Sequence, residues 1–452
     1  MSHSPAPPAR SIARIVSASL IGTTIEWYDF FLYTSAAALV FNKLFFPTVD
    51  PLTGTLLSFA TYAIGFVARP LGGLVFGHFG DKVGRKKLLV LSLLLMGGST
   101  FAMGLLPTYA AIGAGAPILL TLLRLVQGFA LGGEWGGAVL IVSEHGNPAR
   151  RGFWASWPQC GAPGGNLLAT GVLALLATVQ TDAQFFSWGW RIPFLLSGVL
   201  VVIGLWIRLA VSESPVFLAA QAAQNAGVVK RERAPIVLVL RDHWREVLIA
   251  MGARMAENVS YYVITAFILV YLTGPLHLPK SLGLTAVLVG SAFHFVTIPL
   301  WGALSDKVGR RPVYLLGAVG VGIWVFAFFP LLATKTPGLI ILATTVGLVL
   351  HGAMYGPQAA FFSELFGTRV RYSGASIGYQ LASIIAGGLA PLIATALLKA
   401  FGSTVPVALY VVFTCVITVV AVLASRETKG VSLIDAGATG SRLRSEEVAG
   451  VR

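Results

Sequence analysis

Long hydrophobic stretches, separated by short polar segments, follow one another along almost the whole chain. Twelve of them are close to the roughly 20 apolar residues that a helix needs to cross the hydrocarbon core of a bilayer. None shows the alternation of a transmembrane barrel strand, and a helix satisfies every backbone polar group within its own segment. The pattern therefore predicts an all-α integral membrane protein with twelve transmembrane helices. The stretches lie at residues 15–41, 53–79, 88–106, 117–142, 154–178, 191–211, 247–273, 282–303, 312–331, 338–360, 372–398 and 403–424.

The longest polar break, at residues 212–246, falls in the middle of the chain and is rich in basic residues. It separates an N-terminal half at residues 15–211 from a C-terminal half at residues 247–424, with six predicted helices in each. Residues 1–14 and 425–452 are predicted as polar tails. When both tails are placed on one side of the membrane, that side holds 24 of the 32 lysines and arginines. The positive-inside rule then predicts that the tails and the central break are cytoplasmic.

The composition agrees with a chain that lies mostly in lipid. Of the 452 residues, 56% are hydrophobic and 11% are charged, whereas soluble domains carry about 25% charged residues. These values exclude a soluble enzyme, a disordered regulator and a nucleic-acid-binding module, so the net charge of +14 reflects the loops and not a surface for nucleic acid. The two cysteines, Cys160 and Cys415, lie in apolar runs without metal-ligand spacing. We therefore expect no disulfide framework and no metal site.

Two short motifs each occur twice in the chain, and the distance between the two copies is almost the same for both. The segment Gly-His-Phe-Gly-Asp-Lys-Val-Gly-Arg-Lys at 77–86 recurs as Gly-Ala-Leu-Ser-Asp-Lys-Val-Gly-Arg-Arg at 302–311. A Ser-Glu pair at 143–144 recurs at 363–364. The chain is therefore predicted to be a duplicated six-helix unit with two pseudo-symmetric halves. Such repeats place the substrate site near the bilayer midplane, between the halves.

The repeated loop motif resembles the signature of the major facilitator superfamily, Gly-x-x-x-Asp-x-x-Gly-Arg followed by two basic residues. Glu-Trp-Tyr-Asp-Phe at 26–30, Val-Ala-Arg-Pro at 67–70 and Gly-Gly-Glu-Trp-Gly-Gly at 132–137 resemble its metabolite:proton symporter branch. The resemblance covers residues from about 10 to 425 and implies the twelve-helix major facilitator fold in a bacterial inner (plasma) membrane. Members of this branch move shikimate, 2-oxoglutarate, citrate, proline and betaine, so the resemblance leaves the substrate open.

Charged residues within predicted membrane helices are costly, and they usually pair or line a water-filled path. Glu26 and Asp29 lie three residues apart in the first predicted helix, on adjoining parts of one face together with Tyr33. Two carboxylates that are close together in a low dielectric repel each other, so we expect at least one to bind and release the coupling proton. Glu134 in the fourth predicted helix is a third candidate for proton coupling. The alternative is that these carboxylates only pair with arginines and hold the helices together.

Arg124, Gln127 and Glu134 lie within roughly an 80° arc of the fourth predicted helix, at 100° per residue. An arginine keeps its proton and can hold a carboxylate through two hydrogen bonds. The family resemblance implies a coupling pair between an acid of the first helix and an arginine of the fourth. Arg124 is thus expected to serve Asp29 in the empty transporter and the substrate anion in the loaded one. A permanent bridge to Glu134 is the alternative, and Arg69 ranks below Arg124 because its motif gives it no single role.

The C-terminal half offers a second set of polar residues at helical spacing, in the seventh and tenth predicted helices. Arg254 and Glu257 can simply neutralise one another, and His294 fits packing as well as a ligand role. We expect this half to shape substrate specificity. The candidate substrate-binding residues are Arg124, Gln127, Tyr33, Arg254, Glu257, Asn258, Tyr261, His351, Tyr355, Gln358 and Gln159.

The charged loop motifs also have a mechanical interpretation. Asp81 and Asp306 can accept hydrogen bonds from the N-terminus of a neighbouring helix, where the helix dipole favours an anion. In the superfamily that the motif resembles, such contacts latch the cytoplasmic gate closed, and setting topology by positive charge alone is the alternative. We expect Asp81→Asn to reduce transport while the protein stays in the membrane. The predicted latch comprises Gly77, Asp81, Gly84, Arg85, Glu144, Arg151, Asp306, Gly309, Arg310, Glu364 and Arg371.

Together these features predict a proton-coupled symporter that imports a small polar metabolite by alternating access. An organic acid, such as shikimate or a di- or tricarboxylate, is the first choice of substrate. A zwitterion symporter for proline or betaine and a proton-driven efflux antiporter are the alternatives. An intramembrane enzyme is disfavoured because neither an HExxH metal motif nor a nucleophile elbow is present. The expected partners are the substrate, the proton and the lipid bilayer, without a cofactor, a nucleic acid or an obligate protein partner.

Overall fold

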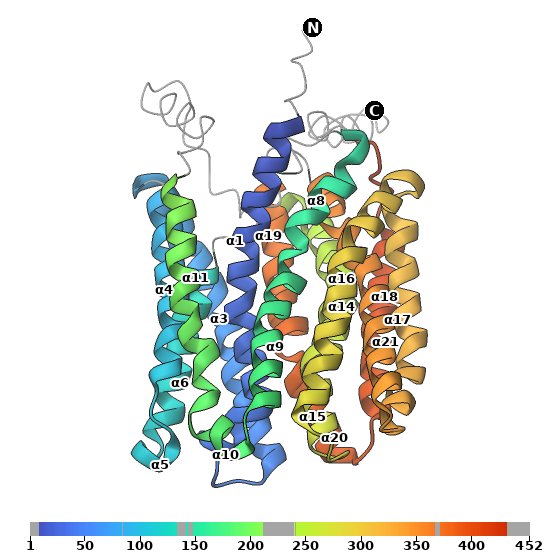
Figure 1. The fold of residues 1–452 in the computed structure, drawn as a ribbon. Helices are drawn as coiled ribbons and strands as arrows, with labels where there is room; N and C mark the ends of the chain where they lie inside the picture. Colours follow the sequence, from blue (N-terminus) through green and yellow to red (C-terminus); the bar gives the residue numbers. More distant parts are fainter. Residues whose placement is uncertain are drawn as a thin grey trace, which may run out of the picture.

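The computed structural model describes residues 9–83, 85–132, 142, 148–210, 239, 241–366 and 371–431. All regular elements within these ranges are helices, and the long ones run roughly along one common axis (Figure 1). The first helix begins and the last helix ends at the same end of this bundle, which we call the terminal end. The other end, where the labels α5, α10, α15 and α20 stand in Figure 1, is called the distal end.

The first half of the chain forms one group of helices, in which α1 packs on α9, α3 packs on α6, and α4 packs on α6 and α11. Its elements are α1 (Ala9–Ala36), η1 (Ala37–Phe41), α2 (Asn42–Leu44), α3 (Pro51–Val83), α4 (Arg85–Leu105), α5 (Tyr109–Ile112), α6 (Gly115–Leu131), η2 (Pro148–Arg150), α8 (Arg151–Gln159), α9 (Gly161–Val179), α10 (Asp182–Gln184), η3 (Phe185–Gly189) and α11 (Arg191–Ala210).

The second half forms a corresponding group, in which α18 packs on α16 and α17, and α21 packs on α14 and α17. Its elements are α14 (Trp244–Tyr262), η4 (Val263–Phe267), α15 (Ile268–Thr273), α16 (Lys280–Val308), α17 (Arg310–Ala333), α18 (Pro337–Leu365), α19 (Arg371–Ala382), η5 (Ser383–Gly388), α20 (Ala390–Phe401) and α21 (Val405–Ala424).

The described parts of all twelve predicted stretches lie on helical elements, which confirms the all-α membrane architecture. Some stretches, such as 154–178 and 372–398, cover consecutive helical segments, and residues 133–141 of the fourth stretch lie outside the described residues. By length and composition, 8 of the described helices can cross a membrane, or 9 if a pair bent by 42° at residues 182–206 forms one span. Of the other three, α1 carries Glu26 and Asp29, and α4 and α6 have shorter apolar parts. The helices α1 and α14 begin at Ala9 and Trp244, earlier than expected, because a helix can continue into the polar region beyond the hydrocarbon core. Most of the central break lies outside the described residues.

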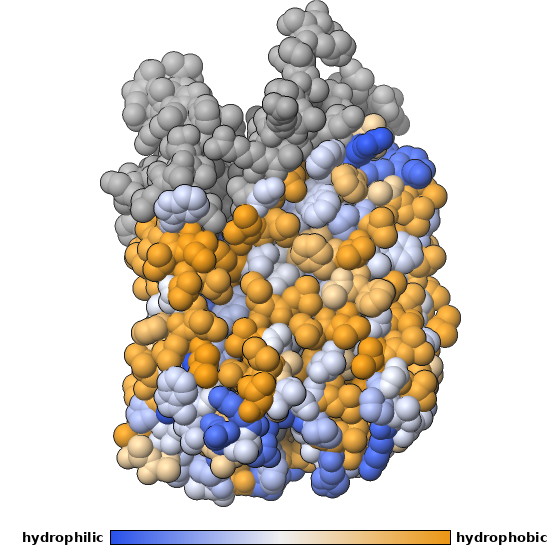
Figure 2. Space-filling model, in the orientation of Figure 1, coloured by the Kyte–Doolittle hydropathy of each residue, from blue (hydrophilic) through white to orange (hydrophobic). Residues whose placement is uncertain are grey.

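The outer surface of the bundle is apolar between its two ends, as lipid contact requires. Large hydrophobic side chains such as Val67, Leu105, Ile323 and Phe413 are more than half exposed. The face shown in Figure 2 is mostly hydrophobic along its height, with hydrophilic residues gathered at the distal end and at the right of the terminal end.

Lipid provides no hydrophobic drive for helix association, so the helices depend on close packing to hold together. Small residues allow this close approach. A Cβ atom added at Gly128 of α6 would lie 1.9 Å from the backbone oxygen of Gly65 in α3. A Cβ atom added at Gly72 of α3 would lie 1.8 Å from the backbone oxygen of Phe129. The backbones of α3 and α6 therefore touch, and this contact fixes the position of the polar side chains that α6 presents to the interior.

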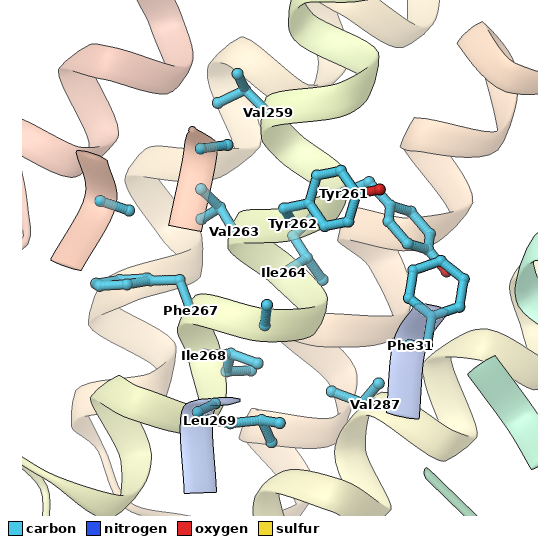
Figure 3. Packing of buried hydrophobic residues seen from close by; sticks show 14 of the residues in the cluster. Phe31, Val259, Tyr261, Tyr262, Val263, Ile264, Phe267, Ile268, Leu269 and Val287 are labelled. Atoms are coloured by element: carbon cyan, nitrogen blue, oxygen red, sulfur yellow. The ribbon is translucent and has the colours of Figure 1, made fainter. Parts of the chain in front are cut away.

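The two halves meet where α8 packs against α16 and α18, where α9 packs against α16, and where α3 packs against η5 and α20. Aromatic side chains fill part of this interface. Figure 3 shows Phe31 of α1 near the aromatic rings of α14, and the ring centroids of Phe31 and Tyr261 are 5.4 Å apart. Predicted site residues from both halves thus border one shared interior.

A π-helical segment interrupts the first long helix of each half. It covers Ala37–Phe41 in the first half and Val263–Phe267 in the second. The distance in sequence between these two segments is almost the same as that between the two copies of the loop motif, at 77–86 and 302–311, which agrees with an internal duplication. Single-turn π segments often mark functional sites in α-helices, and η4 directly follows Tyr261 and Tyr262.

Candidate functional site

Arg124 of α6 is 1% exposed and lies in a cage of aromatic and polar side chains. Its Nη1 donates a hydrogen bond to Oε1 of Gln127, whose Nε2 donates to the hydroxyl of Thr100 in α4 at 2.8 Å. The guanidinium carbon is 4.4 Å from the ring centroid of Tyr33 and 5.1 Å from that of Phe30. Three predicted residues, Tyr33, Arg124 and Gln127, therefore meet in one cluster, to which Thr100 adds a member that sequence reasoning missed.

Asp29 of α1 is 2% exposed and borders the same cluster. Its carboxylate lies next to the hydroxyl of Thr100 and within electrostatic reach of Arg124, but the two charged groups form no direct ion pair. Oδ1 of Asp29 has no hydrogen-bond partner among the described residues. Glu26, one turn earlier, is only partly buried. The proposed alternative bridge from Arg124 to Glu134 cannot be placed, since Glu134 lies outside the described residues.

Arg69 of α3 is a second buried guanidinium in this region, with 7% of its surface exposed. Its guanidinium carbon is 4.1 Å from the ring centroid of Phe66 and 4.9 Å from that of Phe30. The ring of Phe30 therefore contacts both Arg69 and Arg124. Neither arginine forms an ion pair with a carboxylate of the described residues, and Nε of each lacks a hydrogen-bond partner there. The sequence motif ranks Arg69 below Arg124 because it does not reveal that both arginines contact the same ring.

Arg254 of α14 has its own carboxylate, in contrast to the two arginines of the first half. Nη2 of Arg254 is 3.6 Å from Oε2 of Glu257 and 3.2 Å from Oδ1 of Asn258. Nη1 donates to Oε1 of Gln358 at 3.0 Å, and the guanidinium carbon is 3.4 Å from the ring centroid of Tyr379. The predicted residues of the seventh and tenth helices thus form one connected network, in which the positive charge of Arg254 is balanced locally.

Two histidines extend this network. Nδ1 of His351 in α18 is 2.9 Å from Nε2 of His294 in α16, and Nε2 of His351 is 3.1 Å from the backbone oxygen of Glu257. Nε2 of His351 is also 3.6 Å from Oε1 of Glu257. The rings of Tyr261 and Tyr355 lie 5.0 and 5.5 Å from the ring of His351. By sequence, His294 fits a packing role as well as a ligand role. The structure makes it a direct partner of His351.

Two amides of the first half reach into the second half. Nε2 of Gln159 in α8 is 3.4 Å from Oε1 of Gln358. Nδ2 of Asn166 in α9 is 3.3 Å from the hydroxyl of Tyr261 and 3.1 Å from that of Ser291. Ser291 is absent from the predicted site, and Asn166 is only a weak candidate by sequence, as a polar residue within an apolar stretch.

At the terminal end, Asp306 of α16 joins the halves through the first turn of α8. Its carboxylate accepts hydrogen bonds from the backbone N–H groups of Gly152 at 2.8 Å and Phe153 at 2.9 Å. Nη1 of Arg310 donates to the same carboxylate at 2.7 Å. A helix N-terminus favours an anion in this position. This is the type of contact that the loop motif predicts, while its role as a latch stays a prediction.

Glu364 of α18 binds residues from three parts of the chain. Its carboxylate accepts hydrogen bonds from Nη1 of Arg151 at 2.8 Å, from Nε and Nη2 of Arg310 at 3.1 Å each, and from the hydroxyl of Thr428 at 2.8 Å. We call residues 425–431, to which Thr428 belongs, the C-terminal strap. Glu427 of the strap accepts hydrogen bonds from the backbone N–H groups of Arg310 and Arg311 at the start of α17.

The strap is a part of the terminal end that sequence reasoning missed. It binds Glu364, caps α17, and places the backbone oxygen of Val431 3.1 Å from Nη1 of Arg151. Among the predicted latch residues, Gly309 directly precedes α17 with φ of 109°. Six of the predicted latch residues lie outside the described residues, either entirely or in their side chains: Gly77, Asp81, Gly84, Arg85, Glu144 and Arg371.

At the distal end, two ion pairs join the halves. Nζ of Lys399 is 3.1 Å from Oδ2 of Asp50, and Nζ of Lys280 pairs with Oδ1 of Asp182. Contacts therefore connect the halves at both ends of the bundle. Between these ends, the charged residues Asp29, Arg124, Arg254 and Glu257 are each at most 4% exposed.

Comparisons with known proteins agree with this architecture. The profile of the sugar (and other) transporter family matches residues 15–438. An Escherichia coli (strain K12) protein named inner membrane metabolite transport protein YhjE is 43% identical over 431 residues, which cover 94% of this chain and 97% of that protein. The shikimate transporter of the same organism is 41% identical, over 92% of this chain and 95% of its own. Its proline/betaine transporter is 34% identical, over 92% of this chain and 84% of its own.

A solved structure extends the comparison to the fold. The crystal structure of a D-xylose-proton symporter matches with a TM-score of 0.71 and 19% identity, over 92% of this chain and 98% of that one. This likeness confirms the twelve-helix fold that the loop motif predicts. The chain therefore belongs to the sugar (and other) transporter family of the major facilitator superfamily, and it is a multi-pass membrane protein that transports a metabolite.

Proposed function

We propose that this transporter imports a small organic anion together with a proton. The observation that carries the proposal is the pair Arg69 and Arg124, two buried guanidiniums that contact the ring of Phe30 and have no ion-paired carboxylate in the described chain. A buried charge without a partner is costly, by several kcal/mol. A substrate carboxylate supplies two acceptor oxygens that match a guanidinium, so the loaded state completes a site that the empty state leaves short of negative charge.

Asp29 supports the coupling to a proton. It is buried beside Thr100 and Arg124, and one of its carboxylate oxygens has no hydrogen-bond partner among the described residues. A proton on Asp29 removes the negative charge that competes with the substrate for Arg124. Proton and anion then favour each other's binding, and a ligand shifts the equilibrium between two states only through such differential affinity.

The comparisons support a substrate that carries a carboxylate, and they leave open whether it is an anion or a zwitterion. One relative is named a shikimate transporter and another a proline/betaine transporter, and substrates of both kinds carry a carboxylate. A betaine also needs aromatic faces for its quaternary ammonium group. Around Arg124 and Arg69 these faces are occupied by guanidiniums, over Tyr33, Phe30 and Phe66. This arrangement favours a hydroxylated organic acid over a zwitterion. We also propose that both termini lie in the cytoplasm of a bacterial cell and that the direction of transport is import.

The test is transport by the purified protein in liposomes, with shikimate, 2-oxoglutarate, proline and betaine as substrates. We expect an organic acid to enter with protons, so that the external medium becomes alkaline only when substrate is present. Uptake that continues unchanged after the proton and voltage gradients are collapsed would exclude symport. Expulsion of the acid against proton entry would instead support the antiport alternative.

Arginine variants test the anion site separately. Hydrogen bonds to charged groups contribute about 1.5–3 kcal/mol each, so Arg124→Gln and Arg69→Gln should each raise KM for the acid by about tenfold or more. Arg311→Gln is the matched control, since the side chain of Arg311 donates hydrogen bonds only to backbone oxygens at the terminal end among the described residues. An unchanged KM in both site variants would refute the anion site.

A further inference from the structure

We propose that His294, His351 and Glu257 form a second proton-binding site, in the C-terminal half, which holds a coupling proton on His351. The inference rests on the proposed function, because the site matters only if transport is coupled to protons. Its basis is a buried chain of three titratable groups from three helices: His294 of α16, His351 of α18 and Glu257 of α14. The two histidines are at most 1% exposed and Glu257 is 4% exposed.

The hydrogen bonds fix where the hydrogens sit when both histidines are neutral. Nε2 of His351 is 3.1 Å from the backbone oxygen of Glu257, which can only accept, so this nitrogen carries the hydrogen. Nδ1 of His351 is then an acceptor, and Nε2 of His294 at 2.9 Å must donate to it. Nδ1 of His294 then carries no hydrogen, and its lone pair is buried and has no hydrogen-bond partner among the described residues.

That lone pair is the point where a proton can enter. When a proton binds to Nδ1 of His294, the N–H bond at its Nε2 can break and its hydrogen can pass to Nδ1 of His351. One proton has then been added to the chain, His294 is neutral again in its other tautomer, and the imidazolium charge is on His351. The hydrogen bond between the histidines remains, with its direction reversed. No other reactant is needed for this transfer.

The carboxylate of Glu257 stabilises the charge on His351, since Oε1 is 3.6 Å from Nε2 of His351. On its other side, Oε2 of Glu257 is 3.6 Å from Nη2 of Arg254. Among the described residues, the remaining titratable groups that face the histidines are Tyr261 and Tyr355, with ring centroids 5.0 to 6.2 Å from them. Arg254 and Glu257 cancel each other when His351 is neutral. A proton on His351 thus adds one positive charge to the interior, and this charge is offset when the substrate anion binds.

The experiment compares two modes of transport in proteoliposomes. The probe is whichever of shikimate, 2-oxoglutarate, proline and betaine the wild-type protein transports. Each pH unit is equivalent to about tenfold accumulation for one coupled proton, so a gradient of about two units supports about 100-fold accumulation. Counterflow, with the same pH on both sides, needs no net proton movement. We expect His351→Gln and His294→Gln to lower gradient-driven accumulation at least about tenfold more than they lower counterflow. His243→Gln is the matched control, because His243 also lies near a glutamate, 3.9 Å from Glu246, but is partly exposed; it should change neither mode.

Two results would overturn the proposal of a second proton-binding site. Accumulation in His351→Gln at the wild-type level would overturn the proposal. An equal loss of accumulation and counterflow in both site variants would overturn it too, because it would indicate a structural role. If the wild-type protein itself shows no gradient-driven accumulation, the proposed function fails, and this outcome is visible without any variant.

Discussion

Replacing Asp306 by asparagine removes one negative charge from the contact between α16 and the start of α8. The two oxygens of the carboxylate accept hydrogen bonds from the N–H groups of Gly152 and Phe153 at 2.8 and 2.9 Å. An asparagine keeps one acceptor oxygen but turns an NH2 group towards the second N–H group. Arg310 still has Glu364 as a partner, at 3.1 Å, so the substitution does not leave a buried arginine without an acid.

The size of the effect follows from these contacts. A hydrogen bond to a charged group contributes about 1.5–3 kcal/mol, and an anion at a helix N-terminus contributes about 0.3–1 kcal/mol. Their loss destabilises the closed terminal end by about 2–4 kcal/mol. Since 1.36 kcal/mol corresponds to a factor of ten, the open fraction should rise by about 30- to 900-fold, up to full opening.

A cysteine in the contact can report this opening. Ser156 of α8 is fully buried, and its hydroxyl would lie 2.8 Å from a Cβ atom added at Gly302. In a protein whose Cys160 and Cys415 are replaced by alanine, Ser156→Cys should react with a membrane-impermeant maleimide only when the terminal end opens.

We expect the labelling rate of this cysteine to rise by the same factor in Asp306→Asn. Asp182→Asn loses an ion pair at the distal end and should not raise the rate. If Asp306→Asn leaves the labelling rate unchanged in a protein that is still folded and inserted, the contact does not hold the terminal end closed.

Three further predictions concern pH, the strap and helix packing. Hydrogen bonds from Thr53 and from a lysine of the other half lower the pKa of Asp50 from 3.8 to about 2. Its ion pair is therefore lost only as the pH falls towards that value, and Asp50→Asn should keep the wild-type pH profile of uptake between about pH 5 and 8. Thr428→Val should lower the free energy of unfolding by about 1.5–3 kcal/mol, seen as a lower Tm, because it removes a hydrogen bond to a buried carboxylate. Gly128→Ala should lower the free energy of unfolding by about 1–3 kcal/mol through overpacking, whereas Gly98→Ala, with open space around its Cβ position, should not lower the Tm.

Hydrophobic patterning was sufficient to predict the helices, because a bilayer imposes both their length and their internal hydrogen bonding. It could not predict the π-helical segments η1 and η4, since one wider turn leaves no mark in the pattern of apolar residues. It also placed the start of α14 at residue 247 instead of Trp244. Hydropathy follows the hydrocarbon core, while a helix ends where its hydrogen bonds end.

Within the site, neighbours on one helix could be predicted and partners from other helices could not. The contact between Arg124 and Gln127 follows from their spacing of three residues. Thr100, which lies between Gln127 and Asp29, comes from α4, and no periodicity relates the three. The partner of His351 is likewise 57 residues away, in α16. Such contacts depend on how the helices cross, which a single sequence does not encode in any simple pattern.

The C-terminal strap also has a consequence for how the chain is made. Arg151 and Val431, which are hydrogen-bonded in the finished protein, are 280 residues apart. At about 5–20 residues per second, a ribosome needs about 14 to 56 seconds to add that length. During this time the arginine that joins the two halves is already in place, but the residues that complete its surroundings have not been made. The contacts of the terminal end are therefore complete only once the strap has been made, and a product that stops before the strap lacks the hydrogen bonds of Glu427, Thr428 and Val431.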